Sequence, residues 1–247
     1  MRRFIVEKNA IQGRSAMVTG TDARHIQKVL RYKTGDTIRL LDGDGSEYDA
    51  VISGFSSEGV QVFLGDKNPS GNEPTLDLTL AQALLKDRKL DGIIRQITEL
   101  GASRLIPFVS SRSVPVPLSE RFTTRLERWN KIARESIKQC RRGTPPRLDS
   151  PCSFTEMLER SSGSDLKIIF WEKAADPIPH PKPPPIRNAF LVIGPEGGFS
   201  ETEIEQALAA GFIGVGLGPR ILRAETAPLA AIAILQYLFG DMGYKKA

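Results

Sequence analysis

The chain has 247 residues, of which 40% are hydrophobic and 26% are charged, a composition typical of globular proteins. That length allows one large core or two modest ones. The net charge of +5 and the pI near 9.3 favour a polyanionic partner such as nucleic acid, although many proteins are mildly basic without such a partner. Cys140 and Cys152 have no disulfide-framework spacing, which indicates a reducing, cytoplasmic location. We expect no secretion signal and no membrane span, because no apolar run is long enough.

The first 65 residues predict a small β-rich unit. One helix is expected from Asp22 to about Arg31, capped by Thr21, with Ile26, Val29 and Leu30 on one face. The segment 66–75 is polar and rich in Pro, Gly and Asn, so it predicts a linker. The expected strands are 4–6, 37–41, 48–52 and 60–64.

From Leu76 onward, strands alternate with helices, which is typical of a parallel sheet with helical crossovers. Ser200 and Glu203 predict a capping box, and Gly101 and Gly211 stand where helix C-terminal caps belong. The proline-dense segment 176–188 predicts an extended surface loop. The expected strands are 76–81, 104–109, 166–171, 189–193 and 212–217, and the expected helices are 88–100, 119–140, 153–160, 201–210 and 227–239.

Two glycine-rich turns, IGPEGGFS (193–200) and GLGPR (216–220), each follow a predicted strand. Such turns let backbone groups approach a ligand closely, which suits a small polar cofactor. The first is neither a Walker loop nor a dinucleotide fingerprint. Because Glu196 would repel a phosphate, a cationic or zwitterionic cofactor with ribose hydroxyls fits better. An ordinary strand-to-helix turn explains this motif equally well.

Charged residues gather beside the second turn, where Arg223 and Glu225 precede an apolar helix. Thr226 is a suitable N-cap and Pro228 is tolerated in a first helical turn. A loop that only caps the helix would not need so many arginines, acidic residues and glycines. Arg223 and Glu225 are therefore predicted to form the reactive edge of the pocket.

The segment ERFTTRLERWNKIARESIKQCRRG (120–143) covers nearly all of the predicted helix 119–140, which is basic and amphipathic. Its basic residues either form a solvated face or contact phosphates, and the pattern does not decide between the two. His25 and His180 lie in separate regions and no cluster has metal-ligand spacing, so no metal is expected. No nucleophile elbow or Ser-His-Asp set is present in the sequence either.

The motifs HIQKVLRYKTGD (25–36), ITELGASRLIPF (97–108), SSRS (110–113), ERWNKIARESIKQCRR (127–142), IGPEGGFS and LGPRILRAETA (217–227) occur in a characteristic order. In this the chain resembles the ribosomal RNA small subunit methyltransferase E family. These enzymes are 16S rRNA uridine-N3 methyltransferases of the SPOUT superfamily and use S-adenosyl-L-methionine. The chain departs from the family pattern at Gln96, where lysine is usual, and at Ala224, where threonine is usual.

The resemblance implies an α/β fold: a C-terminal SPOUT-type parallel sheet with a deep trefoil knot, plus an N-terminal PUA-like β-barrel. Residues 1–70 would form the RNA-binding barrel, and residues 75–247 the methyltransferase domain with the cofactor site and the dimer interface. It also implies a homodimer that acts on 16S rRNA of the small ribosomal subunit. Periodicity alone would not predict a knot, because chain threading is rare.

For catalysis, Arg223 is expected to hold the charge that develops on a uracil oxygen. Glu225 would either orient Arg223 or accept the N3 proton, and the sequence leaves both roles open. The expected cofactor-binding residues are Phe170, Glu172, Ile193, Gly194, Pro195, Glu196, Gly198, Leu217, Gly218, Ile221, Leu222 and Thr226. The expected RNA-binding residues are Arg2, Arg3, His25, Arg31, Arg112 and Arg142, although His25 could equally be a helix-surface residue that supports the barrel.

Two alternatives remain within this fold. One is a non-catalytic RNA-binding protein of ribosome assembly, against which the intact glycine loops argue. The other is a 2′-O-ribose methyltransferase, which only the family resemblance disfavours. A nucleotide-binding oxidoreductase would need a GxGxxG loop and a downstream acidic residue that the chain lacks.

Overall fold

The computed structural model describes residues 1–113, 121–181 and 183–243. The chain divides into two compact units. The first consists of Met1–Glu73 and Arg134–Pro145, and the second of Pro74–Ala133 and Pro146–Ala247. The last turns of helix α3 (Arg121–Cys140) therefore belong to the first unit, while its earlier turns belong to the second.

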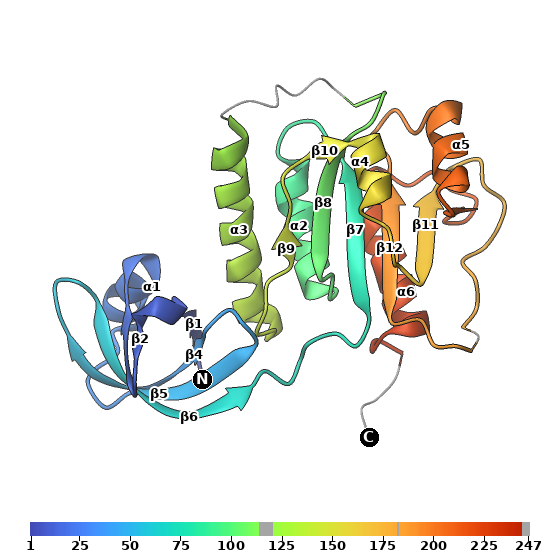
Figure 1. The fold of residues 1–247 in the computed structure, drawn as a ribbon. Helices are drawn as coiled ribbons and strands as arrows, with labels where there is room; N and C mark the ends of the chain where they lie inside the picture. Colours follow the sequence, from blue (N-terminus) through green and yellow to red (C-terminus); the bar gives the residue numbers. More distant parts are fainter. Residues whose placement is uncertain (114–120, 182, 244–247) are drawn as a thin grey trace. The chain divides into compact units, whose positions relative to one another are not determined.

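The first unit is built on a six-stranded sheet of order β1-β4-β5-β6-β3-β2 (Figure 1). β1 runs parallel to β4, and the other neighbours are antiparallel. Alternate residues of its long strands are buried, which gives the unit its own apolar core. Its elements are β1 (Arg3–Ile5), η1 (Lys8–Ala10), β2 (Ile11–Gln12), β3 (Ser15–Val18), α1 (Gly20–Arg24), η2 (His25–Leu30), β4 (Thr37–Leu41), β5 (Ser46–Phe55) and β6 (Val60–Pro69).

Three details of this unit differ from the sequence prediction. The helix begins at Gly20 with Thr19 before it, so the predicted cap at Thr21 was wrong, and it continues as the π-helix η2. β6 runs through Pro69, which makes the first part of the predicted linker 66–75 a strand. Residues 67–69 pair with Ser46–Tyr48 and are all exposed themselves, which explains their polar composition. The short strands β2 and β3 were not predicted.

The second unit is built on a wholly parallel sheet, as predicted, of order β10-β8-β7-β12-β11-β13, with β9 beside β8. The elements agree with the predicted ones within a few residues, except that β9 and β10 are additional. The start of the predicted helix 119–140 lies outside the described residues. The elements are β7 (Asp77–Ala83), α2 (Lys89–Glu99), β8 (Arg104–Val109), α3, β9 (Arg147–Leu148), β10 (Cys152–Ser153), α4 (Phe154–Glu159), β11 (Leu166–Phe170), β12 (Asn188–Ile193), α5 (Glu201–Ala209), β13 (Ile213–Val215) and α6 (Ala227–Phe239).

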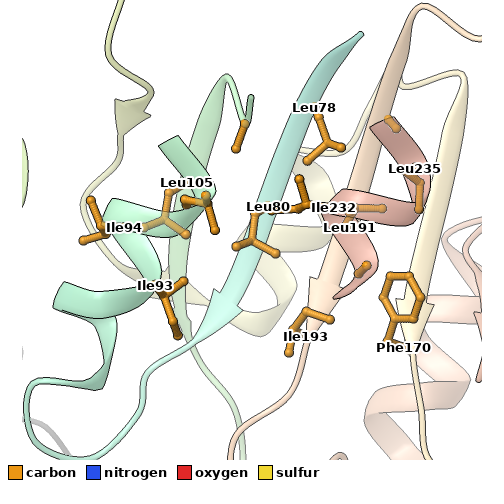
Figure 2. Packing of buried hydrophobic residues seen from close by; sticks show 14 of the residues in the cluster. Leu78, Leu80, Ile93, Ile94, Leu105, Phe170, Leu191, Ile193, Ile232 and Leu235 are labelled. Carbon is orange, nitrogen blue, oxygen red and sulfur yellow. The ribbon is translucent and has the colours of Figure 1, made fainter. Parts of the chain in front are cut away.

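Both faces of this sheet are covered by helices, so its strands are buried on both sides. Leu78, Leu80 and Leu191 join one apolar cluster with residues of α2 and α6 (Figure 2). A second cluster lies on the opposite face with residues of α4 and α5. Helix α6 follows the edge strand β13 along the chain, but it contacts the central strands β7 and β12 and helix α2.

Candidate active site

A cavity of about 1380 Å³ lies in the second unit. Its walls come from the segments that follow β11, β12 and β13, together with Lys89 of α2 and part of α6. Because the three strands are parallel neighbours, their carboxyl ends meet at one edge of the sheet, which is where ligands bind in α/β folds.

The turn after β12 forms one wall of the cavity. Gly198 has a φ of +69°, a conformation that favours glycine. A Cβ at Gly194 would lie 3.0 Å from the Phe199 ring, so this position is close-packed. Gln82, at the end of β7, donates from Nε2 to the Gly194 carbonyl at 3.3 Å. The predicted capping box of Ser200 and Glu203 is confirmed at the start of α5.

The turn after β13 forms a second wall. The Gly216 N–H donates to the Asp176 carbonyl at 3.1 Å, and a Cβ at Gly216 would lie 2.6 Å from the Ala174 carbonyl oxygen. This close approach ties residues 174–176 to the cavity. The predicted surface loop 176–188 is exposed over most of its length, and its residues Asp176, Pro177, Ile178 and His180 also line the cavity.

The start of α6 is organised by the backbone of Arg223. Its carbonyl accepts hydrogen bonds from the N–H groups of Thr226 at 2.8 Å and Ala227 at 2.9 Å. Thr226 already has helical dihedrals, and its side chain makes no capping bond. Thr226 therefore occupies the predicted N-cap position without the side-chain bond, because an N-cap hydroxyl reaches the next N–H groups from an extended backbone. Thr226 is exposed and is not part of the cavity lining.

Lys89 lies between two carboxylates in the cavity. Its Nζ donates to Glu196 Oε1 at 3.0 Å and forms an ion pair with Glu225 Oε2 at 3.3 Å. The hydrogen bond to Glu196 raises the pKa of the Lys89 ammonium above its usual value, and the Glu225 contact adds to it. Burial alone would raise the pKa of Glu196, but the hydrogen bonds from Lys89 and from the Lys86 N–H outweigh it and hold that pKa below its usual range. Lys89 and Glu196 are therefore both charged at neutral pH.

Arg223 and Glu225, the predicted catalytic pair, both line the cavity. Arg223 is exposed, and Glu225 is partly buried. Among the ion pairs of the described residues, Glu225 pairs with Lys89 and not with Arg223. Lys89 was missed by sequence reasoning, although it opens the helix after β7, a strand that ends at the same edge of the sheet.

The predicted cofactor-binding residues come together here. All of them except Thr226 line the cavity. Beyond the two glycine turns and the strand end 170–172, which the sequence indicated, the cavity is also lined by Lys89, by residues of the segment 174–180 and by the α6 residues Ile234 and Leu238.

The predicted RNA-binding residues occupy different environments. Arg2, His25 and Arg31 are exposed on the first unit. Arg3 has a side chain only 13% exposed and pairs with Glu47 at 3.2 Å. Arg142 has a side chain 6% exposed and pairs with Glu73 at 3.4 Å.

Arg112 lies in the second unit, where its Nη1 donates to the Gly197 carbonyl at 3.1 Å. Several basic residues of α3 are also engaged: Arg128 pairs with Asp91, and Lys138 pairs with Asp22. For the residues that form these ion pairs, a structural role is favoured over contact with phosphates.

In the part of the chain that the structure describes, no group of three or more His, Cys, Asp or Glu side chains could hold a metal ion. No helix within the described ranges has the length and hydropathy needed to cross a membrane.

Comparison with known proteins gives the same family over nearly the whole chain. The RNA methyltransferase domain family matches residues 72–236, and the RNA methyltransferase PUA domain family matches residues 18–65. The chain is 33% identical to the ribosomal RNA small subunit methyltransferase E of Bacillus subtilis (strain 168), over 96% of each protein.

Comparison with solved structures leads to the same family. The ribosomal RNA small subunit methyltransferase E from Neisseria gonorrhoeae, bound to S-adenosyl methionine, has a TM-score of 0.87 and 32% identity, covering 98% of this chain and 99% of that one. A putative methyltransferase from Legionella pneumophila with bound S-adenosyl methionine has a TM-score of 0.86 and 29% identity, covering 97% and 98% of the two chains. The chain belongs to the ribosomal RNA small subunit methyltransferase E family of RNA methyltransferases.

Proposed function

We propose that the protein transfers a methyl group from S-adenosyl-L-methionine to N3 of one uridine in the 16S rRNA of the small ribosomal subunit. The observation that carries the proposal is the cavity at the carboxyl ends of β11, β12 and β13, with Arg223 and Glu225 in its lining. Family membership supplies the reaction class. Two relatives of known structure bind the same cofactor.

The residues of the cavity fit this cofactor. Its methionine part is cationic at sulfur and at the amino group, and the carboxylates of Glu172, Asp176, Glu196 and Glu225 line the cavity. Glu225 Oε2 is buried and, among the described residues, has the ion pair with Lys89 but no further hydrogen-bond donor, so it keeps acceptor capacity to offer a ligand. Phe170, Ile193 and Leu217 supply apolar wall for the adenine, and the glycine turns allow backbone groups to approach it.

When bound, the cofactor supplies an electrophilic methyl carbon on a sulfonium sulfur. The residues of the chain act on the uracil. N3 must lose its proton to solvent before its electron pair can form the bond to carbon, and negative charge then spreads to the uracil oxygens. Arg223 is always charged and offers directed donors, so it stabilises this charge.

Three further features are proposed on the family resemblance. The segment 216–226 would form part of a deep trefoil knot, which the packing of α6 against central strands supports. The protein would be a homodimer, which the exposed apolar side chains Ile234 and Tyr237 of α6 support. The first unit would be the PUA-like RNA-binding barrel, with Arg2, His25 and Arg31 on its exposed surface, acting in the cytoplasm.

The test uses small ribosomal subunits from a strain that lacks this protein. They are incubated with the purified protein and isotopically labelled S-adenosyl-L-methionine, and the digested rRNA is analysed by mass spectrometry. Label in 3-methyluridine at one site is the expected result. Label in a 2′-O-methyl nucleoside would replace the proposed target, and absence of both label and cofactor binding would favour a non-catalytic RNA-binding role.

A further inference from the structure

Lys89 connects two loops that are far apart in the sequence. Its Nζ lies 3.0 Å from Glu196 in the turn after β12 and 3.3 Å from Glu225 in the segment before α6. The side chains of Lys89, Glu196 and Glu225 are each about one-third exposed, so they lie in the cavity wall and not on the open surface.

Helix stability does not explain a lysine at this position. Lys89 is the first residue of α2, where the helix dipole is positive and a cation is unfavourable. In the cavity, Lys89 donates one hydrogen bond to the Glu196 carboxylate. The backbone N–H of Lys86 donates a second one to it, at 3.4 Å. The position of Lys89 is therefore better explained by its contacts in the cavity.

The two carboxylates would not stay together without a cation between them. Both have an oxygen within 3.3 Å of the same nitrogen, and like charges at such short separations repel. Lys89 cancels one of the two negative charges, and the cluster of three groups keeps a net charge of −1. That net charge suits a cationic ligand, while the geometry fixes the spacing between the two loops.

We propose that Lys89 is a positioning residue for methyl transfer, which holds Glu196 and Glu225 at a common point and so sets the spacing of the two cofactor loops. The inference rests on the proposed function and deepens it. It also assigns Glu225 a role that the sequence left open. Held by an ammonium group, Glu225 acts as a charged acceptor that shapes the site and not as the base that removes the N3 proton.

The test compares Lys89→Met, which keeps the length of the side chain without its charge, with Lys89→Arg. Arg95→Met is the matched control, because it removes one positive charge from an exposed position of the same helix. Calorimetric titration of the full-length protein measures the affinity for S-adenosylmethionine and for S-adenosylhomocysteine, whose sulfur is neutral. Thermal unfolding of each variant checks that it is folded.

We expect Lys89→Met to lower the affinity for both ligands by about tenfold, as the loss of charge-assisted hydrogen bonds predicts. Lys89→Arg should recover most of that affinity, and Arg95→Met should change neither. Unchanged affinities for Lys89→Met would overturn the proposal. If Lys89→Met bound S-adenosylmethionine more tightly but S-adenosylhomocysteine with unchanged affinity, the proposal would also be overturned. Lys89 would then act only by repelling the positive sulfur.

A double-mutant cycle isolates the positioning role. Glu196→Gln and Glu225→Gln should have non-additive effects on S-adenosylhomocysteine affinity when Lys89 is present and additive effects in the Lys89→Met protein. Equal coupling in both backgrounds would overturn the proposal. These binding measurements do not depend on the RNA target. If Lys89 behaves as expected but small subunits receive no label, only the proposed function fails; if the wild-type protein binds neither ligand, both fail.

Discussion

The buried carboxylate of Glu203 accepts hydrogen bonds from the backbone N–H and the hydroxyl of Ser111, each at 2.9 Å, across 92 residues of sequence. The same carboxylate caps α5 through Ser200. Arg112, the next residue, donates to the Gly197 carbonyl. One carboxylate thus fixes both the helix that follows the first glycine turn and the segment that contacts this turn.

We predict that Glu203→Gln lowers the free energy of unfolding by about 2 kcal/mol at neutral pH, the usual cost of losing hydrogen bonds to a buried charge. Burial alone would raise the pKa of Glu203, but the hydrogen bonds from Ser200 and Ser111 outweigh it and hold that pKa below its ordinary value. The stabilisation is therefore complete above the ordinary glutamate pKa and is lost as the pH falls through the lower, folded-state pKa.

Urea unfolding of both proteins at neutral pH and at successively lower pH tests this. The difference in stability between wild type and variant should shrink as the pH falls. Glu201→Gln is the control, because Glu201 is exposed and makes only a surface ion pair with Lys173. A difference that does not depend on pH would contradict the assigned role of the Glu203 charge.

Of the hydrogen bonds that Glu203 accepts, those from Ser200 could be predicted from the sequence and those from Ser111 could not. The capping box depends on residues three apart, so its pattern is visible in the sequence. The contact with Ser111 depends on which strands are neighbours, and nothing local to Ser111 or Glu203 encodes the order β8-β7-β12. The alternation of strands and helices predicts a parallel sheet but not its strand order.

The same limit applies to the cavity. The glycine turns were predicted because their chemistry is local, and parallel strands bring them to one edge. Lys89 was missed because its significance comes from Glu196 and Glu225, which are more than 100 residues away. Asp176 and His180 were missed because a proline-rich composition predicts only an exposed loop, and nothing in that composition indicates that Gly216 holds the start of the loop beside the cavity.

We predict that Arg223→Ala lowers the rate of methyl transfer to small subunits by about 10²–10³-fold, the usual effect of removing one donor that stabilises developing charge. Arg223 is exposed at the cavity, so its loss should not unfold the protein. Single-turnover methyl transfer and calorimetric cofactor binding are measured in parallel. Binding should persist, and an unchanged rate would show that Arg223 does not act on the reacting base.

Gly216→Ala should weaken cofactor binding, whereas Gly214→Ala should not. A Cβ at Gly216 would lie 2.6 Å from the Ala174 carbonyl oxygen, a backbone atom that cannot move without displacing residues 174–176 of the cavity wall. Nothing lies within 4 Å of a Cβ at Gly214, two residues earlier on β13. Calorimetric titration with S-adenosylhomocysteine measures both variants. Equal affinities would mean that the 174–176 segment can shift without cost to the site.

Gly101 lies just past the C-terminal end of α2, and its carbonyl accepts a hydrogen bond from Gln236 Nε2 of α6 at 3.2 Å. Its φ is +86°, and a Cβ there would lie 2.8 Å from that same nitrogen. We predict that Gly101→Ala lowers the free energy of unfolding by about 2 kcal/mol or more, from left-handed strain and from the clash. Gly92→Ala, in open space on α2, should instead stabilise by about 0.5–1 kcal/mol. Urea unfolding distinguishes the two variants. Unchanged stability of Gly101→Ala would mean that Gln236 of α6 can move away from the added Cβ at little cost.

Arg2 and Arg3 are neighbours in sequence but should respond differently to charge reversal. Arg2 is exposed on the first unit, so Arg2→Glu should weaken binding to small subunits and reduce its dependence on salt without changing stability. Arg3 pairs with Glu47 in a largely buried contact, so Arg3→Glu should place two like charges together and destabilise the protein.

Filter binding at two salt concentrations and thermal unfolding measure both effects, and cofactor affinity serves as the reference that neither variant should change. Arg3→Glu must be compared with Arg3→Met, which removes the charge without adding a carboxylate and leaves Glu47 paired with Arg39. If Arg3→Met keeps its stability but loses subunit binding, Arg3 contacts RNA as well as Glu47. If it keeps both, the charge of Arg3 matters only inside the first unit.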